Sequence, residues 1–199
     1  DSAMNELLRT QKEEANAAFT KFVRRNYESW VQHPDADDTP LLSPMVMRKT
    51  VLPKLKAGKR VVWVVLDNFR YDQWRTLAKA LANDFDIDEQ LYYAILPTVT
   101  QYARNALFAG LMPLDLKQQY PHLWVDEEED EGKNQHEEEL LRKQLERLRQ
   151  PTAFSYHKLN DSSAAEQALA SYAEWSKHPL NVVVINFIDM LSHARTESK

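Results

Sequence analysis

The stretch Val61-Val62-Trp63-Val64-Val65-Leu66-Asp67-Asn68 is an apolar run that ends on a carboxylate and an amide. An apolar run bounded in this way is typical of a buried strand in a parallel sheet. A second such run, residues 181–187, leads into Asp189, and His193 follows four residues later. Ligands of open α/β sheets bind at the carboxyl ends of the strands. We therefore expect the two strand ends to meet at one site.

Strand-like and helix-like segments alternate from residue 59 onward. Strands are expected at residues 61–66, 91–96, 153–157 and 181–187, and helices at about residues 69–83, 100–110 and 162–175. Such alternation predicts an α/β fold, a three-layer α/β/α domain with a mainly parallel sheet.

A helical lead-in is predicted over residues 1–58, before an α/β domain at residues 59–199. Apolar side chains recur at helical spacing over residues 5–31, which predicts one long helix packed on a neighbour. A dimerising coiled coil is the alternative, although the heptad pattern is short and imperfect. Residues 44–56 predict a second, short helix.

The composition excludes several classes of protein. A hydrophobic content of 43% predicts a substantial core, and the net charge of −5 argues against a general nucleic-acid coat. The chain has no cysteine, no secretory signal pattern and no apolar run of membrane-spanning length, which fits a cytoplasmic protein. Only three glycines are present, so any phosphate is expected to be held by side chains and metals instead of a glycine-rich loop.

Residues 126–149 are almost wholly charged. This pattern predicts a charged helical insertion, a hairpin or arm that is solvated on its surface. A weaker alternative is an acidic arm that docks a basic partner.

Asp67 and Thr100 each have a structural and a functional interpretation. Either side chain could cap the helix that follows it. As the functional alternative, Thr100 would lie beside free N–H groups at a helix N-terminus, a good place for a phosphate. A divalent metal could make its hydroxyl acidic enough to be both a ligand and a nucleophile. Arg104 and Asn105, one turn later, could contact phosphate oxygens.

Asp189 and His193 are four residues apart, so a helical turn would place both on one face as a chelating pair. The spacing alone is a weak motif. Among the remaining histidines, His157 at a strand end is the least improbable extra ligand.

Three stretches resemble the PglZ domain of the alkaline-phosphatase superfamily: residues 64–74, residues 96–110, and residues 185–196. The lead-in is similar to the region that joins the receiver and PglZ domains in PorX-type response regulators. Together the resemblance covers about residues 5–199.

The resemblance implies a phosphodiesterase or phosphatase with two zinc ions, in a cytoplasmic response regulator linked to type IX secretion. By this match Asp67 binds one metal, Thr100 is the nucleophile and a bridging ligand, and Asp189 and His193 bind the other metal. The spacing from Thr100 to Ala109-Gly110 favours Thr100 over Thr98. The expected substrate is a small phosphate ester or an oligonucleotide-like molecule. Expected protein partners are a sensor kinase or a sigma factor, without a membrane.

The later ligands of this family, an Asp-His pair and a final His, do not follow Asp189 in this sequence. We therefore expect the N-terminal part of a PglZ domain, with an incomplete sheet, incomplete metal sites and no activity alone. Open apolar edges would favour a homodimer. The alternative function is a non-catalytic regulatory module that binds a sensor kinase or a transcription factor.

Overall fold

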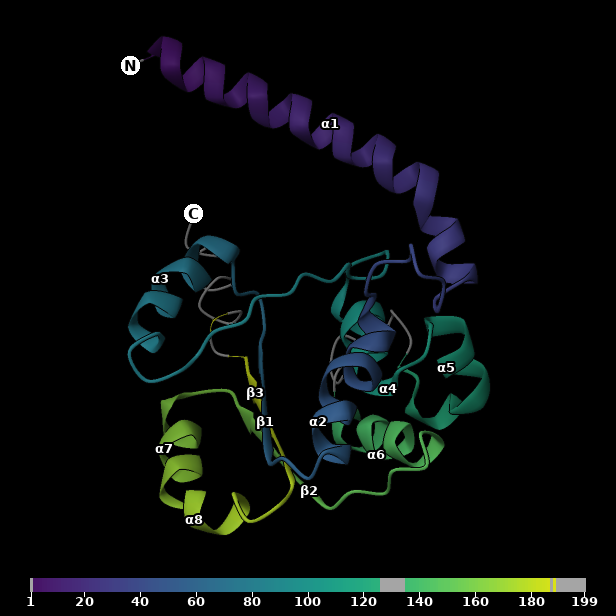
Figure 1. Cartoon of the computed structure of the whole chain (residues 1–199), viewed down its shortest axis with the longest axis vertical. Helices are drawn as coiled ribbons and strands as arrows, with labels where there is room; N and C mark the ends of the chain where they lie inside the picture. Colours follow the sequence, from purple (N-terminus) through teal and green to yellow (C-terminus); the bar gives the residue numbers. More distant parts are fainter. Residues whose placement is uncertain (1, 126–134, 187, 189–199) are drawn as a thin grey trace. The chain divides into compact units, whose positions relative to one another are not determined.

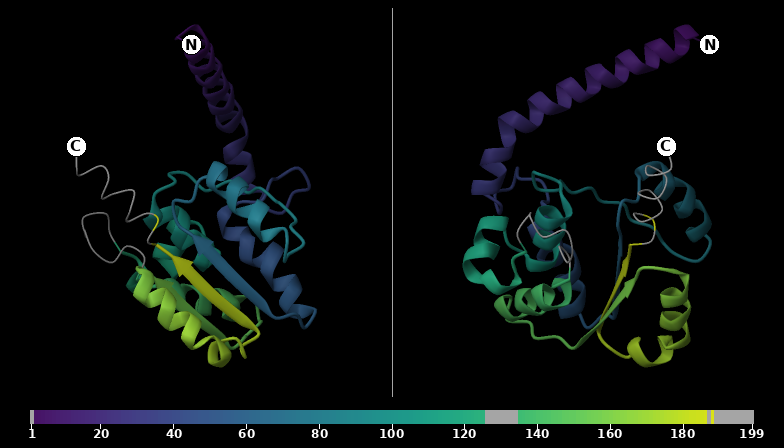
Figure 2. Two further views of the ribbon diagram at one scale, coloured as in Figure 1. Left: turned by 90° about the vertical axis from the view of Figure 1, so that its left-hand side faces the viewer. Right: turned by 180° about the vertical axis from the view of Figure 1, so that it is seen from behind.

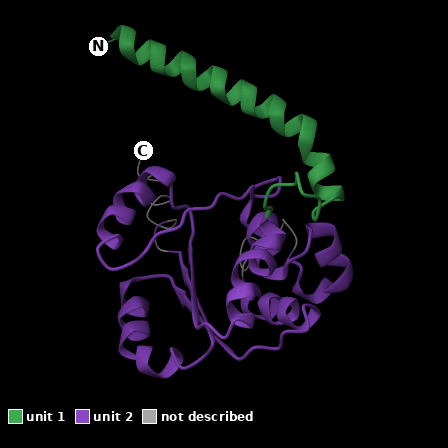
Figure 3. Cartoon of the chain, viewed as in Figure 1, with its two compact units in different colours: residues 1–42 green, residues 43–199 purple. Residues whose placement is uncertain are grey.

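The structure, a computed structural model, describes residues 2–125, 135–186 and 188. The chain separates into two compact units, residues 1–42 and 43–199 (Figure 3). Residues 43–58, which the sequence analysis placed with the lead-in, belong to the second unit. Their side chains Met47, Val51 and Leu55 are buried in the core of that unit.

The first unit is dominated by one long helix, α1 (Ser2–Gln32). This confirms the helix predicted over residues 5–31. Its aromatic side chains contact one another along the helix, with ring centroids 6.5 Å apart for Phe19 and Phe22 and 5.5 Å apart for Phe22 and Trp30. No helix in the described ranges is long and apolar enough to cross a membrane.

The second unit is built on a parallel sheet. Its strands β1 (Val61–Leu66), β2 (Phe154–Leu159) and β3 (Leu180–Ile185) follow the order β1-β3-β2. Leu180 of β3 pairs with Val61 on one side and with Phe154 on the other. The parallel sheet is confirmed, and the central strand β3 is buried as predicted. The prediction of full burial is wrong for β1, where Val62 and Val64 are exposed.

Helices cover both faces of this sheet, as a three-layer α/β/α fold requires. Helices α3, α7 and α8 lie on one side of it, and α2, α4 and α6 lie on the other (Figures 1 and 2). The helical segments of this unit are η1 (Ser43–Met45), η2 (Met47–Val51), α2 (Leu52–Lys56), α3 (Tyr71–Leu81), η3 (Thr100–Arg104), α4 (Asn105–Ala109), α5 (Pro113–Gln119), η4 (Pro121–Leu123), α6 (Glu137–Arg147), α7 (Ser162–Ala170) and α8 (Tyr172–Trp175).

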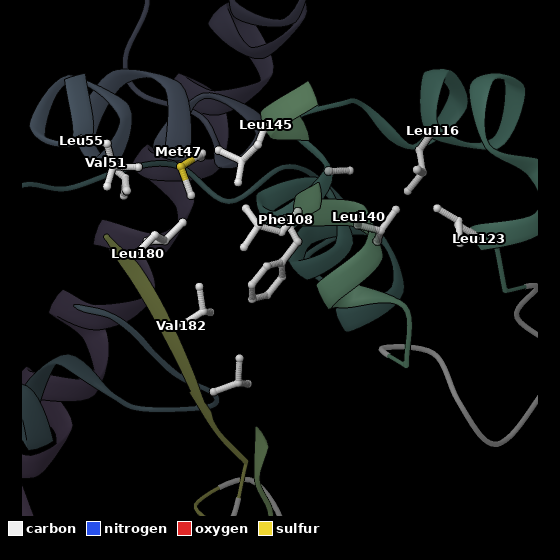
Figure 4. Packing of buried hydrophobic residues seen from close by; sticks show 13 residues of the cluster. Met47, Val51, Leu55, Phe108, Leu116, Leu123, Leu140, Leu145, Leu180 and Val182 are labelled. Atoms are coloured by element: carbon white, nitrogen blue, oxygen red, sulfur yellow. The ribbon is translucent and has the colours of Figure 1, made fainter. Parts of the chain in front are cut away.

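The main core lies between the sheet and helices α2, α4 and α6 (Figure 4). Phe108 of α4 is fully buried and contacts two strands, because its ring lies 5.3 Å from Trp63 of β1 and 6.3 Å from Tyr156 of β2. Burial of a side chain of this size stabilises the fold by roughly 1.5–3 kcal/mol. Helix α4 ends at Gly110, whose φ of 63° favours glycine.

The strand predicted at residues 91–96 is wrong. Apart from a single bridge at Tyr93, this segment is extended without joining the sheet. Its backbone groups are satisfied elsewhere, since Ser43 N–H donates to Tyr93 O (3.1 Å) and Ile95 N–H donates to Ser43 Oγ (3.2 Å). Ile95 is the one fully buried side chain of this run, whereas Leu91 and Leu96 are exposed, so the run is largely at the surface.

The prediction of a solvated arm is also wrong for residues 137–147. This stretch is α6, and one face of it is buried. The buried positions follow helical spacing, which forms a stripe between the charged residues: Glu137, Leu140, Leu141, Gln144 and Leu145. The high overall charge of the stretch led to the prediction of a solvated segment, although its apolar residues recur at helical spacing. The remainder of the predicted arm, residues 126–134, lies outside the described residues.

Candidate active site

The candidate site begins where β1 ends. Asp67 N–H donates to Ile185 O (3.1 Å), so the parallel hydrogen bonding continues for one residue past the strand. Asn68 then adopts a φ of 55° and turns the chain toward α3. Asp67 does not cap α3, because the N-cap is Arg70, which is held by Gln73. The capping interpretation of Asp67 is therefore wrong.

Thr100 is the first residue of the continuous helical segment formed by η3 and α4. Val99 is its N-cap residue, and Val99 O accepts from Tyr102 N–H and Ala103 N–H, both at 2.9 Å. The Thr100 hydroxyl therefore does not fill the N-cap position that the structural interpretation gave it. The helix start predicted at Thr100 is confirmed.

Asp67 and Thr100 line the same cavity, which has a volume of about 300 Å³. They come from segments far apart in the sequence, the end of β1 and the start of η3. Polar lining residues accompany them: Ser43, Asn68, Arg70, Thr98 and Arg104. Two of the four predicted site residues thus converge at the carboxyl end of β1, as expected for an α/β sheet. Asp189 and His193, the other two, lie outside the described residues.

Arg104 joins the cavity to the interior. Its Nη1 lies 2.6 Å from Asp67 Oδ2, and its Nη2 donates to Glu137 Oε2 at 3.0 Å. Its Nε also forms an ion pair with Glu137 Oε1. The Arg104 side chain is 7% exposed and Glu137 is fully buried, whereas Asp67 is 25% exposed. One edge of the guanidinium therefore lies in the interior, and one nitrogen reaches the cavity.

Two residues of β2 complete this arrangement. Tyr156 Oη donates to Glu137 Oε2 at 2.6 Å, and Lys158 Nζ lies 3.4 Å from the same oxygen. Burial raises the pKa of Tyr156 well above its usual value, and the Glu137 carboxylate raises it further. Tyr156 therefore stays a hydrogen-bond donor. Burial lowers the pKa of Lys158, an effect that Glu137 opposes.

Sequence analysis named Arg104 but missed Glu137, Tyr156 and Lys158. Tyr156 and Lys158 alternate along β2, which places both side chains on the face toward α6. Two polar side chains on the same face of a strand, close to its end, could have been predicted to lie near the site. Glu137 offered none, because it is one of many carboxylates in a charged stretch.

Asp67 and Thr100 supply oxygen donors, which suit a divalent cation. The described ranges contain no group of three or more His, Asp or Glu side chains placed to hold a metal ion. His157, the extra ligand considered above, instead packs its ring 4.8 Å from that of Trp175. Two donors facing one cavity fit part of a metal site.

Comparison with known families adds an independent finding. The chain matches the BREX system PglZ alkaline phosphatase-like domain over residues 46–199. It matches the PorX response regulator linker domain over residues 1–31. No curated protein sequence matches the chain.

Proposed function

Because the chain belongs to the PglZ alkaline phosphatase-like family, we propose that it is a metal-dependent hydrolase of phosphate esters. The observation that carries this proposal is the cavity at the end of β1, which Asp67 and Thr100 line together. An acidic metal ligand at a strand end, with a hydroxyl from a helix start in the same cavity, supplies a metal-binding group and a nucleophile for in-line attack on a phosphate ester. The family match alone supports a phosphoesterase-type domain, and the roles below are our proposal.

Thr100 is the proposed nucleophile, and Asp67, Thr100, Asp189 and His193 are the residues that would hold two zinc ions. When bound, zinc would lower the pKa of the hydroxyl and stabilise charge on the phosphate. Thr100 lines the cavity from the first turn of a helix, so its position in the cavity is set by the helix backbone. Positioning of this kind contributes to catalysis by holding the hydroxyl near the phosphorus.

Arg104 is the proposed phosphate-binding cation. It lines the cavity one helical turn after Thr100, and its guanidinium is mostly shielded from water. A guanidinium N–H donates a charge-assisted hydrogen bond to a phosphate oxygen, and a low dielectric strengthens the attraction. This arrangement favours a small phosphate ester, including an oligonucleotide-like one.

The linker match supports a regulatory setting for this activity. We propose an output domain of a cytoplasmic response regulator linked to type IX secretion, with a sensor kinase or a sigma factor as its protein partners. The helix α1 spans the matched region.

Hydrolysis of bis-(p-nitrophenyl) phosphate by the intact protein, with zinc present, tests the proposal. Thr100→Val should reduce kcat at least about 10³-fold, because a lost nucleophile cannot be replaced by binding alone. Thr98→Val is the matched control, since Thr98 lines the same cavity and should keep most of the activity. Circular dichroism checks that both variants are folded.

Equal activity of Thr100→Val and the wild-type protein would refute the assignment of the nucleophile. If the zinc-loaded wild type cleaves no phosphate ester, the alternative function, a non-catalytic regulatory module that binds protein partners, replaces the enzyme.

A further inference from the structure

A group of buried and partly buried charged and polar side chains adjoins the cavity. We call it the Arg104 cluster, and its members are Asp67, Arg104, Glu137, Tyr156 and Lys158. They come from five places in the chain: the end of β1, η3, the start of α6, and two positions of β2. Only Asp67 and Arg104 line the cavity.

Arg104 is shared unequally between its two carboxylates. Glu137 is paired with two nitrogens of the guanidinium, Nε and Nη2, whereas Asp67 is paired with Nη1. The Nε contact is a charge pair without a hydrogen bond, but both oxygens of Glu137 lie against the guanidinium in the interior, where an ion pair is little screened by water. Arg104 is therefore anchored on Glu137 and reaches Asp67 with its remaining nitrogen.

The anchor is difficult to break because Glu137 is fully buried. Its Oε2 also accepts from Tyr156 and lies 3.4 Å from Lys158 Nζ. Removal of one partner from a buried ion pair is strongly destabilising, since a charge is left without compensation. Asp67 is 25% exposed, so water can replace the Arg104 contact there at a smaller cost.

The charges of the cluster are balanced, with two carboxylates facing two cationic side chains. A divalent cation at Asp67 would stand close to the Arg104 guanidinium, and like charges at such a separation repel strongly in a partly buried site. The cation and Arg104 therefore compete for the same carboxylate. An anion in the cavity would relieve the repulsion.

From this geometry we propose that Arg104 is an internal competitor for the cation that Asp67 binds, with Glu137 as its fixed anchor. Arg104 neutralises Asp67 when no divalent ion is bound. When an ion binds, Arg104 releases Asp67, stays attached to Glu137, and offers Nη1 to an anion. Binding of the cation and of phosphate is then coupled. This inference rests on the proposed role of Asp67 as a metal ligand.

Calorimetric titration of the intact protein with zinc alone, and then with zinc in the presence of inorganic phosphate, tests the competition. In the wild type, phosphate should tighten zinc binding about tenfold, which lies within the usual range for coupled sites. Arg104→Gln should bind zinc alone about tenfold more tightly than the wild type, and phosphate should no longer change its affinity.

Glu137→Gln should have the opposite effect. Without its anchor, Arg104 would have Asp67 as its remaining carboxylate partner in the cluster, so zinc binding should weaken about tenfold. A purely structural role would weaken zinc binding in both variants. Arg142→Gln is the control, because it changes an exposed arginine of α6 and should leave both titrations unchanged.

The double variant Arg104→Gln/Glu137→Gln removes both charges and covers the case in which a single variant does not fold. It should also bind zinc more tightly than the wild type. Unchanged or weaker zinc binding by Arg104→Gln, or by the double variant where the single one is unfolded, would overturn the inference. A wild type that binds no zinc would do the same. Because the readout is binding, a protein that binds zinc as described but cleaves no phosphate ester would refute the proposed function alone.

Discussion

The two faces of the sheet differ sharply, although the same three strands supply both. On the face toward α6, Val182 is fully buried and Trp63 packs against the core. On the face toward α7, Val62 and Val64 are 49% and 48% exposed. Neighbouring residues of one apolar run therefore have opposite surroundings. Apolar composition identified the strands, but the helices decide which face is dry.

The helices that lie on these two faces show the same contrast. α3 and α6 each contain 11 residues. α3 has no buried residue, whereas α6 buries five, including Glu137 and Gln144. The buried ion pair of Arg104 and Glu137 thus lies on the dry face, where charge–charge interactions are strongest.

The largest test of this contrast compares two leucines. Leu140→Ala on α6 should lower the free energy of unfolding by about 3 kcal/mol, because it leaves a cavity in a closely packed core. Leu77→Ala on α3 should lower it by less than about 1 kcal/mol, since Leu77 is already exposed. Urea unfolding measures both values. Equal losses would remove the difference between the two helices.

A sharper test uses the sheet itself and one kind of substitution. Val182→Thr buries a hydroxyl on the dry face and should destabilise the fold by about 1–3 kcal/mol. Val64→Thr places the same hydroxyl where water can reach it and should change stability by about 0.5 kcal/mol or less. The shift of the urea midpoint at constant m reports each change. A costly Val64→Thr would show that the open face is covered in solution.

The smallest expected effect concerns His157, which lies on the face toward α7. Burial lowers the pKa of His157 below its ordinary 6.5, and His178 lowers it further, while Glu138 opposes both. The His157 side chain therefore binds a proton more tightly in the unfolded chain than in the folded protein. The contribution of the neutral His157 side chain to the free energy of unfolding is fully present above pH 6.5. It is lost as the pH falls from 6.5 toward the lower pKa of the folded state.

His157→Phe removes this titration. Between about pH 7 and about pH 5, its Tm should fall by about 2 °C less than that of the wild type. Thermal melts in matched buffers measure the difference. Parallel Tm curves for the two proteins would show that His157 does not contribute to the acid sensitivity of this face.

Sequence patterns predicted most of the fold because the evidence was local. The strand at Val61–Leu66 and the start of the helix at Ser162 were both found in this way. The prediction of a strand at residues 91–96 failed because apolar composition alone does not ensure burial or pairing in a sheet, and most of this segment is exposed. Its backbone partner, Ser43, is distant in the sequence.

The candidate site was predictable in part for the same reason. Asp67 and Thr100 stand at recognisable ends of a strand and a helix, and the structure brings them to one cavity. Glu137 could not be chosen among its charged neighbours without knowing which helix face is buried. The roles of Asp189 and His193 remain predictions.

The position of β3 in the sheet has a consequence for biosynthesis. Of the three strands in the described part of the chain it comes last, yet it is the strand with which both others pair. During translation, β1 and β2 are synthesised before β3, so neither has its hydrogen-bonding partner until β3 has emerged. The ribosome therefore releases most of this unit before its sheet can close, and such a delay leaves apolar segments available to chaperones.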